Sequence, residues 1–199
     1  MKKSRGQIAI EVVHDSIFPN KCLFCCRVMD DLREIFCGGC ADYAACDYND
    51  EAVRHVIFRF KYEGKRMLAR RMAEMIFRSL GEIDADCLVC VPLHEKRMKE
   101  RGYNQAGLLA LELSGLCGVP AYDGMTRVRE TARQFDLKPE ERAANVAGAF
   151  GLKEGFCVAA KDVLLVDDVL TTGATAAECG RVLTEAGAKS VKLAAFARA

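Results

Sequence analysis

The chain contains 199 residues, which suffices for one main domain with a small additional module. Apolar residues make up 51% and charged residues 29%, as in ordered soluble proteins, and no apolar run approaches the roughly 18 residues that a membrane span needs. The formal net charge of +1 argues against a protein that is basic throughout. Residues 1–15 begin with basic side chains but contain only a short apolar patch, so we expect no signal peptide, no membrane insertion and a cytoplasmic location.

The N-terminal quarter is rich in cysteine: six of the eleven cysteines lie within residues 22–46. A disulfide scaffold is disfavoured in a reducing compartment, so metal binding or burial must account for them. Two CxxC pairs separated by eleven residues suit a tetrahedral zinc site, and a site filled by four thiolates is structural. We therefore predict a zinc-binding module over residues 1–48 with four Zn²⁺ ligands: Cys22, Cys25, Cys37 and Cys40.

Two alternatives to this zinc site stay open, namely redox-active CxxC pairs and buried thiols. Cys26 and Cys46 also lie close enough in sequence to replace one of the four ligands. The five cysteines after residue 48 occur in apolar or helical surroundings, and we expect them in the core.

Residues 49–199 are predicted to form a second, larger domain. Apolar side chains at helical spacing follow Asn49 and again follow Lys65, with Gly64 between the two stretches. A continuous apolar run at 87–93 is typical of a buried parallel strand. A third helix is expected over 104–116.

The second half of this domain begins with residues 123–148, which lack a sustained apolar period and predict a long flexible loop followed by a short helix. A strand at 148–152, a strand at 162–168, a helix over 175–185 and a last strand at 190–197 come next. Alternating strands and helices predict an α/β domain with a mostly parallel sheet covered on both faces.

An adjacent pair of acids, Asp167 and Asp168, ends the apolar strand that begins at Val163. Ligands of parallel sheets bind beyond the carboxyl ends of strands, and the threonine- and glycine-rich residues 171–175 that follow can hold a phosphate with backbone N–H groups and hydroxyls. An acid beside this anion site would repel the phosphate unless a sugar lies between them. Because carboxylates accept hydrogen bonds from vicinal hydroxyls, the pattern predicts a ribose 5-phosphate site.

Paired acids at a strand end also occur in the Walker B segments of nucleoside triphosphatases and in phospho-acceptor receiver domains. No GxxxxGK[ST] loop is present, and only 32 residues follow Asp167, too few for the rest of a receiver domain. A strand and a capped helix without any ligand would leave the acid pair unexplained.

The stretch "VLLVDDVLTTGAT", Val163 to Thr175, resembles the signature by which type I phosphoribosyltransferases bind 5-phosphoribosyl 1-diphosphate (PRPP). Four further stretches resemble the ComF family of phosphoribosyltransferase-like competence proteins: "IFPNKCLFC", "FKYEGKRMLARRMAE", "VPLHEKRMKERGYNQAGLLA" and "RVRETARQFDLKPEERAANVAGAF". They lie in the family's order and cover nearly the whole chain. The resemblance implies a type I phosphoribosyltransferase fold.

The resemblance further implies an enzyme that binds PRPP with Mg²⁺ and transfers the 5-phosphoribosyl group to an unidentified acceptor, with a part in natural competence. Lys61 to Lys65 resemble the loop that holds the diphosphate, and Arg97 faces either the diphosphate or the second substrate. The residues expected to bind PRPP are Lys61, Tyr62, Glu63, Gly64, Lys65, Arg97, Asp167, Asp168, Val169, Leu170, Thr171, Thr172, Gly173, Ala174 and Thr175.

Residues 127–150 resemble the flexible loop that closes over PRPP in these enzymes and excludes water from the transition state. Arg129 and Arg133 are the catalytic candidates near its tip, beside Asp167, Asp168 and Lys61, while Arg142 and Asn145 are expected to fasten its base. No residue stands out as a general base. His94 is either a base or a polar cap of the strand before it, and we expect the strand cap.

A second function of a different class is a non-catalytic adaptor that binds single-stranded DNA, together with proteins of the competence machinery. Basic side chains at 59–78 and 96–101 can follow a phosphate backbone, although aromatic stacking partners are few. A PRPP-sensing regulator would need a DNA-reading element, and none is recognisable in the sequence.

Overall fold

A computed structural model describes residues 42–129, residue 131 and residues 139–199. The four cysteines predicted to bind zinc lie outside these ranges, so the zinc module stays a prediction. In the described part of the chain, no cluster of three or more histidine, cysteine or acidic side chains could hold a metal ion. No helix there combines the length and the apolar character that a membrane span requires.

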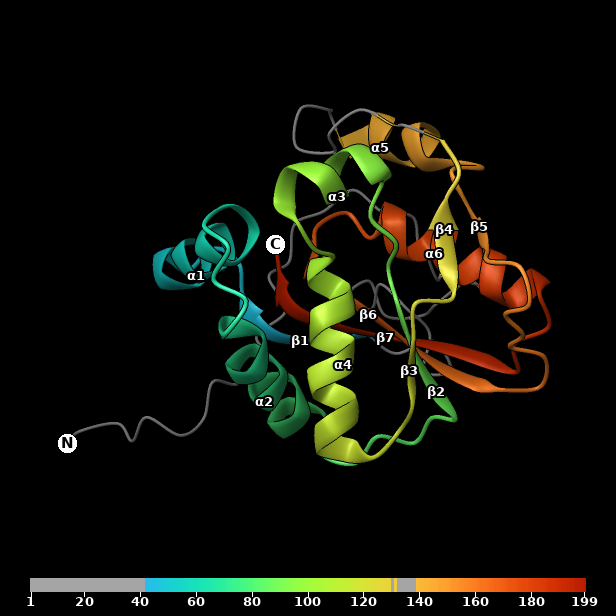
Figure 1. The fold of residues 1–199 in the computed structure, drawn as a ribbon, viewed down its shortest axis with the longest axis horizontal. Coiled ribbons are helices and arrows are strands. Elements are labelled where there is room, and N and C mark those ends of the chain that lie inside the picture. Colours follow the sequence, from blue (N-terminus) through green and yellow to red (C-terminus); the bar gives the residue numbers. More distant parts are fainter. Residues whose placement is uncertain (1–41, 130, 132–138) are drawn as a thin grey trace.

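The centre of the molecule is a five-stranded parallel sheet (Figure 1). This confirms the predicted α/β class with a parallel sheet. In spatial order the strands are β1 (Asp42–Asp47), β7 (Ser190–Arg198), β6 (Asp162–Leu170), β2 (Cys87–Cys90) and β3 (Ala121–Tyr122).

Three helices cover the two faces of the sheet. Helices α2 (Leu68–Leu80) and α4 (Gln105–Cys117) pack on each other and on one face, in front of the sheet in Figure 1, and α6 (Ala174–Glu185) packs on the opposite face. The central strand β6 is therefore enclosed on both sides, which explains the unbroken apolar run from Val163 to Val166.

The amphipathic pattern of α2 positions it against the sheet. Its buried residues Ala69, Met72, Ala73 and Ile76 recur at the three- and four-residue spacing of one helix face. These residues belong to the same hydrophobic core as the buried residues of the sheet. One continuous core thus fixes the positions of α2 and α4 along the strand direction, relative to the carboxyl ends of the strands.

Two helices lie near those carboxyl ends. Helix α1 (Glu51–Tyr62) precedes α2, and the short α3 (Glu95–Arg101) follows β2. The His94 side chain caps α3, because its Nδ1 accepts a hydrogen bond of 3.3 Å from the Lys96 backbone N–H. It therefore caps the helix that follows, whereas the sequence suggested a cap of the preceding strand. Asn104 occupies the N-cap position of α4, but its side chain donates to the Val91 carbonyl at 3.0 Å instead of capping the helix.

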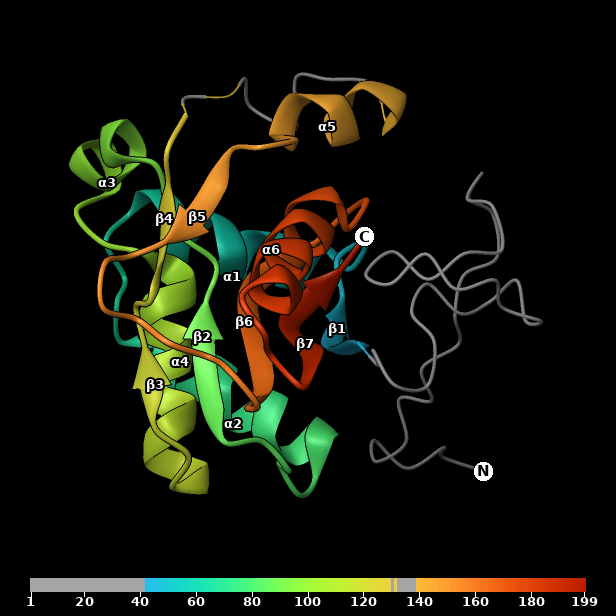
Figure 2. The ribbon, with the colours of Figure 1, turned by 90° about the vertical axis from the view of Figure 1, so that its right-hand side faces the viewer.

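A small two-stranded antiparallel sheet lies beside the main one. It is formed by β4 (Met125–Arg127) and β5 (Phe150–Leu152), and α5 (Pro139–Val146) lies between them in sequence and above them in Figure 2. The short helix predicted at the end of segment 123–148 is thus present, with Pro139 at its first position, where its missing N–H costs nothing.

Strand β1 differs from the predicted division of the chain. The predicted boundary at residue 48 places residues 42–47 in the N-terminal module, but they pair with β7 as the edge strand of the main sheet. Their backbone hydrogen bonds come from a strand about 150 residues later in the chain, a contribution that no local pattern announces.

Candidate functional site

The carboxyl ends of β2 and β6 define the place where a ligand is expected. The two strands are parallel neighbours, with Cys90 opposite Val166. After β2 the chain passes through α4 on one face to β3, whereas after β6 it passes through α6 on the other face to β7. Because the connections leave in opposite directions, a crevice opens between these two strand ends, the usual ligand site of open α/β sheets.

The two adjacent acids, Asp167 and Asp168, lie at the carboxyl end of β6 and point to opposite faces of the sheet. Both are still within β6, where successive side chains alternate between the two faces. The Asp168 carboxylate, 7% exposed as a residue, forms an ion pair of 3.0 Å with the Lys61 ammonium on α1. The structure therefore brings together two of the predicted site residues that are 107 positions apart.

Asp167 lies in a different electrostatic environment. Burial, and next the charge of Asp168, raise the pKa of Asp167 to about 7, against the smaller opposing effects of a hydrogen bond and of nearby cations. That hydrogen bond runs from the Asp168 backbone N–H to the Asp167 carboxylate at 2.8 Å. At neutral pH this carboxyl is thus close to its midpoint, so the site readily accepts an additional positive charge or hydrogen-bond donor.

The loop after the acids has the features of an anion cradle. Gly173 adopts φ = 74°, a left-handed conformation that favours glycine, and directly precedes α6. The first turn of α6 contains no acidic residue and no side chain caps it, so its N–H groups are not claimed by a local carboxylate. Within the described residues, the Thr172 hydroxyl is buried without a hydrogen-bond partner.

The turn between α1 and α2, predicted to hold the diphosphate, is tied to the start of α4. Tyr103 donates a hydrogen bond from its hydroxyl to the Phe60 carbonyl. Arg66 donates to the Gly102 carbonyl at 3.0 Å and lies over the Tyr103 ring. These contacts hold Lys61 beside the acid pair, while Lys65 in the same turn is exposed.

The other residues of that turn have local contacts. Arg101 stacks on the Tyr62 ring, with 5.2 Å from its guanidinium carbon to the ring centroid. Glu63 pairs with Arg59 at 3.2 Å on the exposed side of α1. Within the described part of the chain, Lys61 is the member of the predicted group 61–65 that contacts the acid pair.

Arg127 is a site residue that the sequence analysis did not single out. It ends β4, opposite Phe150 of β5, and its guanidinium lies 5.2 Å from the Phe150 ring centroid. Burial, and then the charge of Arg97, lower the pKa of Arg127 to about 10, and the charge of Asp167 acts in the opposite sense. Arg127 thus lies near a predicted PRPP-binding residue and near the acid pair.

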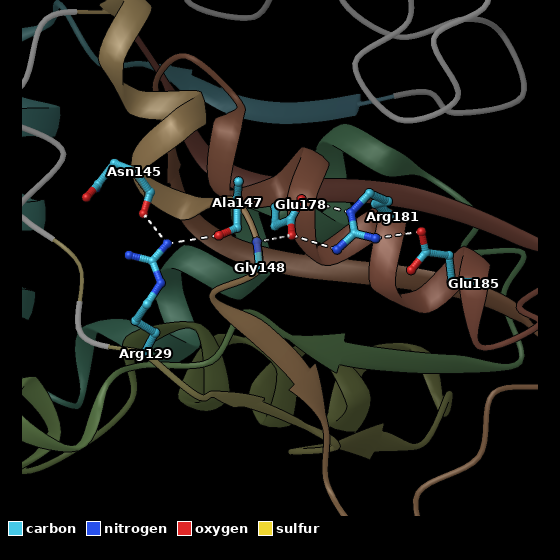
Figure 3. A network of polar contacts seen from close by, with 7 residues as sticks. All are labelled: Arg129, Asn145, Ala147, Gly148, Glu178, Arg181 and Glu185. Carbon is cyan, nitrogen blue, oxygen red and sulfur yellow. Dashed lines mark hydrogen bonds and ion pairs between the residues drawn. The ribbon is translucent and has the colours of Figure 1, made fainter.

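A network of polar contacts joins the β4 side of the site to α6 (Figure 3). Arg129 donates hydrogen bonds to the carbonyls of Asn145 and Ala147, at 3.1 and 2.8 Å. The Gly148 N–H donates to Glu178 of α6 at 2.7 Å, and Glu178 also pairs with Arg181. Arg129 therefore joins the start of segment 127–150 to its end through backbone carbonyls, and its catalytic role stays a prediction. The fastening roles expected of Arg142 and Asn145 also stay predictions, and Arg133 lies outside the described residues.

Comparison with known proteins extends these observations. The family model described as "Phosphoribosyl transferase domain" matches residues 65–199. Competence protein F of Haemophilus influenzae is 31% identical over 75% of this chain and 69% of its own length. Competence protein ComFC of Streptococcus pneumoniae is 31% identical over 80% of this chain and 69% of its own length. DNA utilization protein YhgH of Escherichia coli K12 is 32% identical over 69% of this chain and 63% of its own length.

Two solved structures are more distant. A glutamine PRPP amidotransferase from B. subtilis superposes on 69% of this chain and 30% of its own, with 20% identity and a TM-score of 0.48. The allosteric regulatory enzyme of purine biosynthesis covers 69% of this chain and 29% of its own, with 19% identity and a TM-score of 0.47.

The raised pKa of Asp167 predicts a pH-dependent gain in stability for Asp167→Asn. The folded protein binds this proton more tightly than the unfolded chain, so the wild type loses stability as the pH rises from about 4 to about 7, and the amide does not. We expect the variant to have a free energy of unfolding higher by about 1–3 kcal/mol at pH 8 and close to the wild-type value at pH 4.

Urea denaturation across this pH range measures the difference. The exposed Asp84, which precedes β2 at the opposite end of the sheet, supplies the control Asp84→Asn, whose effect should not vary with pH in the same way. A difference for Asp167→Asn that is equally large at pH 4 and pH 8 would contradict the assignment.

Proposed function

The chain belongs to the ComF family of phosphoribosyltransferase-like competence proteins, and on this premise we propose that it binds PRPP and transfers the 5-phosphoribosyl group to an acceptor. The main observation behind the proposal is the acid pair at the crevice between the ends of β2 and β6. It is directly followed by the N-terminus of α6, where backbone N–H groups can bind a phosphate. Competence protein F and YhgH, whose names refer to competence and DNA utilization, suggest a role in handling incoming DNA. The chain covers 63–69% of the length of these relatives. That this chain shares their activity is therefore part of the proposal.

The ribose and its 5-phosphate fit the two halves of the β6–α6 connection. The carboxylates of Asp167 and Asp168 would accept hydrogen bonds from the 2- and 3-hydroxyls of the ribose. The 5-phosphate would lie against the N–H groups at the start of α6, where the Thr172 hydroxyl lacks a partner. The left-handed Gly173 lets the backbone approach the phosphate closely.

The diphosphate is expected on the side of β2, between α1 and α3. Lys61 is held at 3.0 Å from Asp168, so its ammonium can turn to a diphosphate oxygen once ribose hydroxyls contact that carboxylate. Cations placed where charge develops on the departing diphosphate lower the barrier to its loss. The chain would hold the ribose by its acids and draw the negative charge of the leaving group towards its lysine and arginine side chains.

The donor set of the acid pair also fits Mg²⁺ accompanying PRPP. Oxygen ligands suit this ion, and both acids offer them at the carboxyl end of β6. When bound, Mg²⁺ neutralises part of the diphosphate charge. The chain's own residues orient the sugar and exclude water from it.

Calorimetric titration of PRPP with Mg²⁺ tests the proposal. We expect wild-type protein to bind with micromolar affinity, and the Asp167→Asn, Asp168→Asn double variant to lose at least about 100-fold, since two charge-assisted hydrogen bonds are weakened. Asp84→Asn should bind like the wild type. Lack of binding by folded wild type at millimolar PRPP would refute the transferase proposal.

We further propose that the two CxxC pairs hold one structural zinc ion, because four thiolates form the donor set that Zn²⁺ prefers. Purified protein should contain about one zinc per chain by elemental analysis. The Cys22→Ser, Cys25→Ser double variant should lose the metal, whereas Cys157→Ser, at an exposed position of the phosphoribosyltransferase domain, should keep it. A zinc content unchanged in the double variant would exclude these ligands.

Binding of single-stranded DNA is a second candidate, favoured by an exposed aromatic pair on α1. Phe58 and Tyr62 are 53% and 61% exposed, with ring centroids 5.2 Å apart, and Arg101 stacks on Tyr62. Exposed rings flanked by arginine suit base stacking beside a phosphate backbone. Because both rings are largely exposed, packing in the hydrophobic core does not explain why they lie next to each other on α1.

Fluorescence anisotropy with a labelled oligothymidylate tests this surface. Affinity should fall as salt rises, and Phe58→Ala, Tyr62→Ala should weaken binding by about tenfold or more, since stacking is worth about 1–3 kcal/mol per base. The control Tyr122→Ala removes a ring that is 42% exposed at the far edge of the sheet. An equal loss in the control, or no binding at low salt, would rule the surface out.

A further inference from the structure

The last turn of α1 places Lys61 at the acid pair, 3.0 Å from the Asp168 carboxylate. Phe60 belongs to the same turn and is fully buried. The last four carbonyls of an α-helix have no partner within the helix, and a buried carbonyl without a donor costs free energy. This helix end therefore needs a hydrogen-bond donor from another part of the chain.

Tyr103 supplies that donor. Its hydroxyl donates a hydrogen bond to the carbonyl of Phe60, which lies 43 positions earlier, and the centroids of the two rings are 5.7 Å apart. Tyr103 is only 7% exposed, so solvent competes little for this hydrogen bond. It lies between α3 and α4, in the connection that follows β2. The residue directly before Lys61 is thus held by both the hydroxyl and the ring of Tyr103.

Arg66 makes a second contact between the same two parts of the chain. Its guanidinium carbon lies 4.8 Å from the Tyr103 ring centroid, and its Nη donates a hydrogen bond of 3.0 Å to the Gly102 carbonyl. Gly102 adopts φ = 76°, a conformation that favours glycine. Because Arg66 comes from the turn between α1 and α2, two consecutive residues, Gly102 and Tyr103, hold both the end of α1 and the turn that follows it.

We propose that Tyr103 is a positioning residue of the transferase site, whose hydrogen bond to Phe60 fixes the last turn of α1 so that the Lys61 ammonium reaches the diphosphate. This inference rests on the proposed function. Tyr103 would not touch the reacting atoms and would act through Lys61. A lysine has a long flexible stem, so a fixed backbone limits the space that its ammonium samples and lowers the entropy lost when it binds an anion.

A purely structural role for Tyr103 is the competing explanation, because its ring belongs to the hydrophobic core. Removal of the hydroxyl leaves the Phe60 carbonyl without this donor and lowers stability in either case, so stability alone does not separate the two roles. Dependence on Lys61 does separate them. A positioning role affects PRPP affinity only while Lys61 is present, whereas a structural role affects it equally without that lysine.

The experiment is a double-mutant cycle in which PRPP with Mg²⁺ is titrated calorimetrically into wild type, Tyr103→Phe, Lys61→Gln and the double variant. We expect Lys61→Gln to lower PRPP affinity about 10- to 100-fold, since a charge-assisted hydrogen bond is lost. Tyr103→Phe keeps the ring and should lower affinity about 5- to 20-fold in the wild-type background. In the Lys61→Gln background the same substitution should change affinity by no more than about twofold.

Tyr122→Phe is the matched control. It also removes one phenolic hydroxyl, but from a ring that is 42% exposed on the edge strand β3. We expect this variant to bind PRPP like the wild type, with or without Lys61. Thermal melting of each variant sets a titration temperature below every unfolding midpoint, so that all affinities refer to folded protein.

Each other outcome overturns the inference in a recognisable way. If wild type and Tyr103→Phe bind PRPP equally well, Tyr103 has no positioning role, although the proposed function stands. Equal losses for Tyr103→Phe with and without Lys61 assign Tyr103 to structure alone. If Lys61→Gln binds PRPP as tightly as wild type, Tyr103 cannot act through Lys61. If folded wild type does not bind PRPP, the proposed function fails and this inference fails with it.

Discussion

Strand β6 has to satisfy two opposing requirements, and the organisation of the molecule follows from them. Its first part is enclosed by α4 on one face and α6 on the other, so it must be apolar on both. Its last part carries two acids to the sheet edge, where charge is tolerated only with partners. Because strand side chains alternate, each acid meets different elements: Asp168 meets α1, and Asp167 faces the side of α6 and β4.

The elements around this edge supply those partners unequally. Lys61 balances Asp168 through a close ion pair that is largely shielded from solvent. Asp167 has more distant cations, and its raised pKa shows that they do not compensate for its burial. The site therefore has one acid that is already neutralised and one that is poised near neutral pH. Such asymmetry between neighbouring carboxyls allows the pair to hold hydroxyl donors and to tolerate an approaching cation.

Local patterns in the sequence sufficed for the strand at 162–168 and for the helix at 175–185, because apolar runs and a glycine before a helix are short-range signals. They also sufficed to locate the connection between β6 and α6, whose residues are consecutive. The ion pair between Lys61 and Asp168 depends on the packing of α1 against the sheet edge, and the proximity of Arg127 to Arg97 depends on where β4 lies. Neither has a periodic signature, since the partners are 107 and 30 positions apart. Strand β1 was not predicted for the same reason, because its partner β7 lies at the other end of the chain.

Helix α6 begins directly after Gly173 and, one turn later, Glu178 accepts the hydrogen bond from the Gly148 N–H. Four positions separate Ala174 from Glu178, and an α-helix turns by about 100° per residue. One residue inserted or deleted between them would swing the carboxylate away from Gly148 while leaving the helix itself intact. The number of residues in this first turn is therefore constrained more strictly than their identity. We expect related chains to differ there by substitutions far more often than by insertions or deletions.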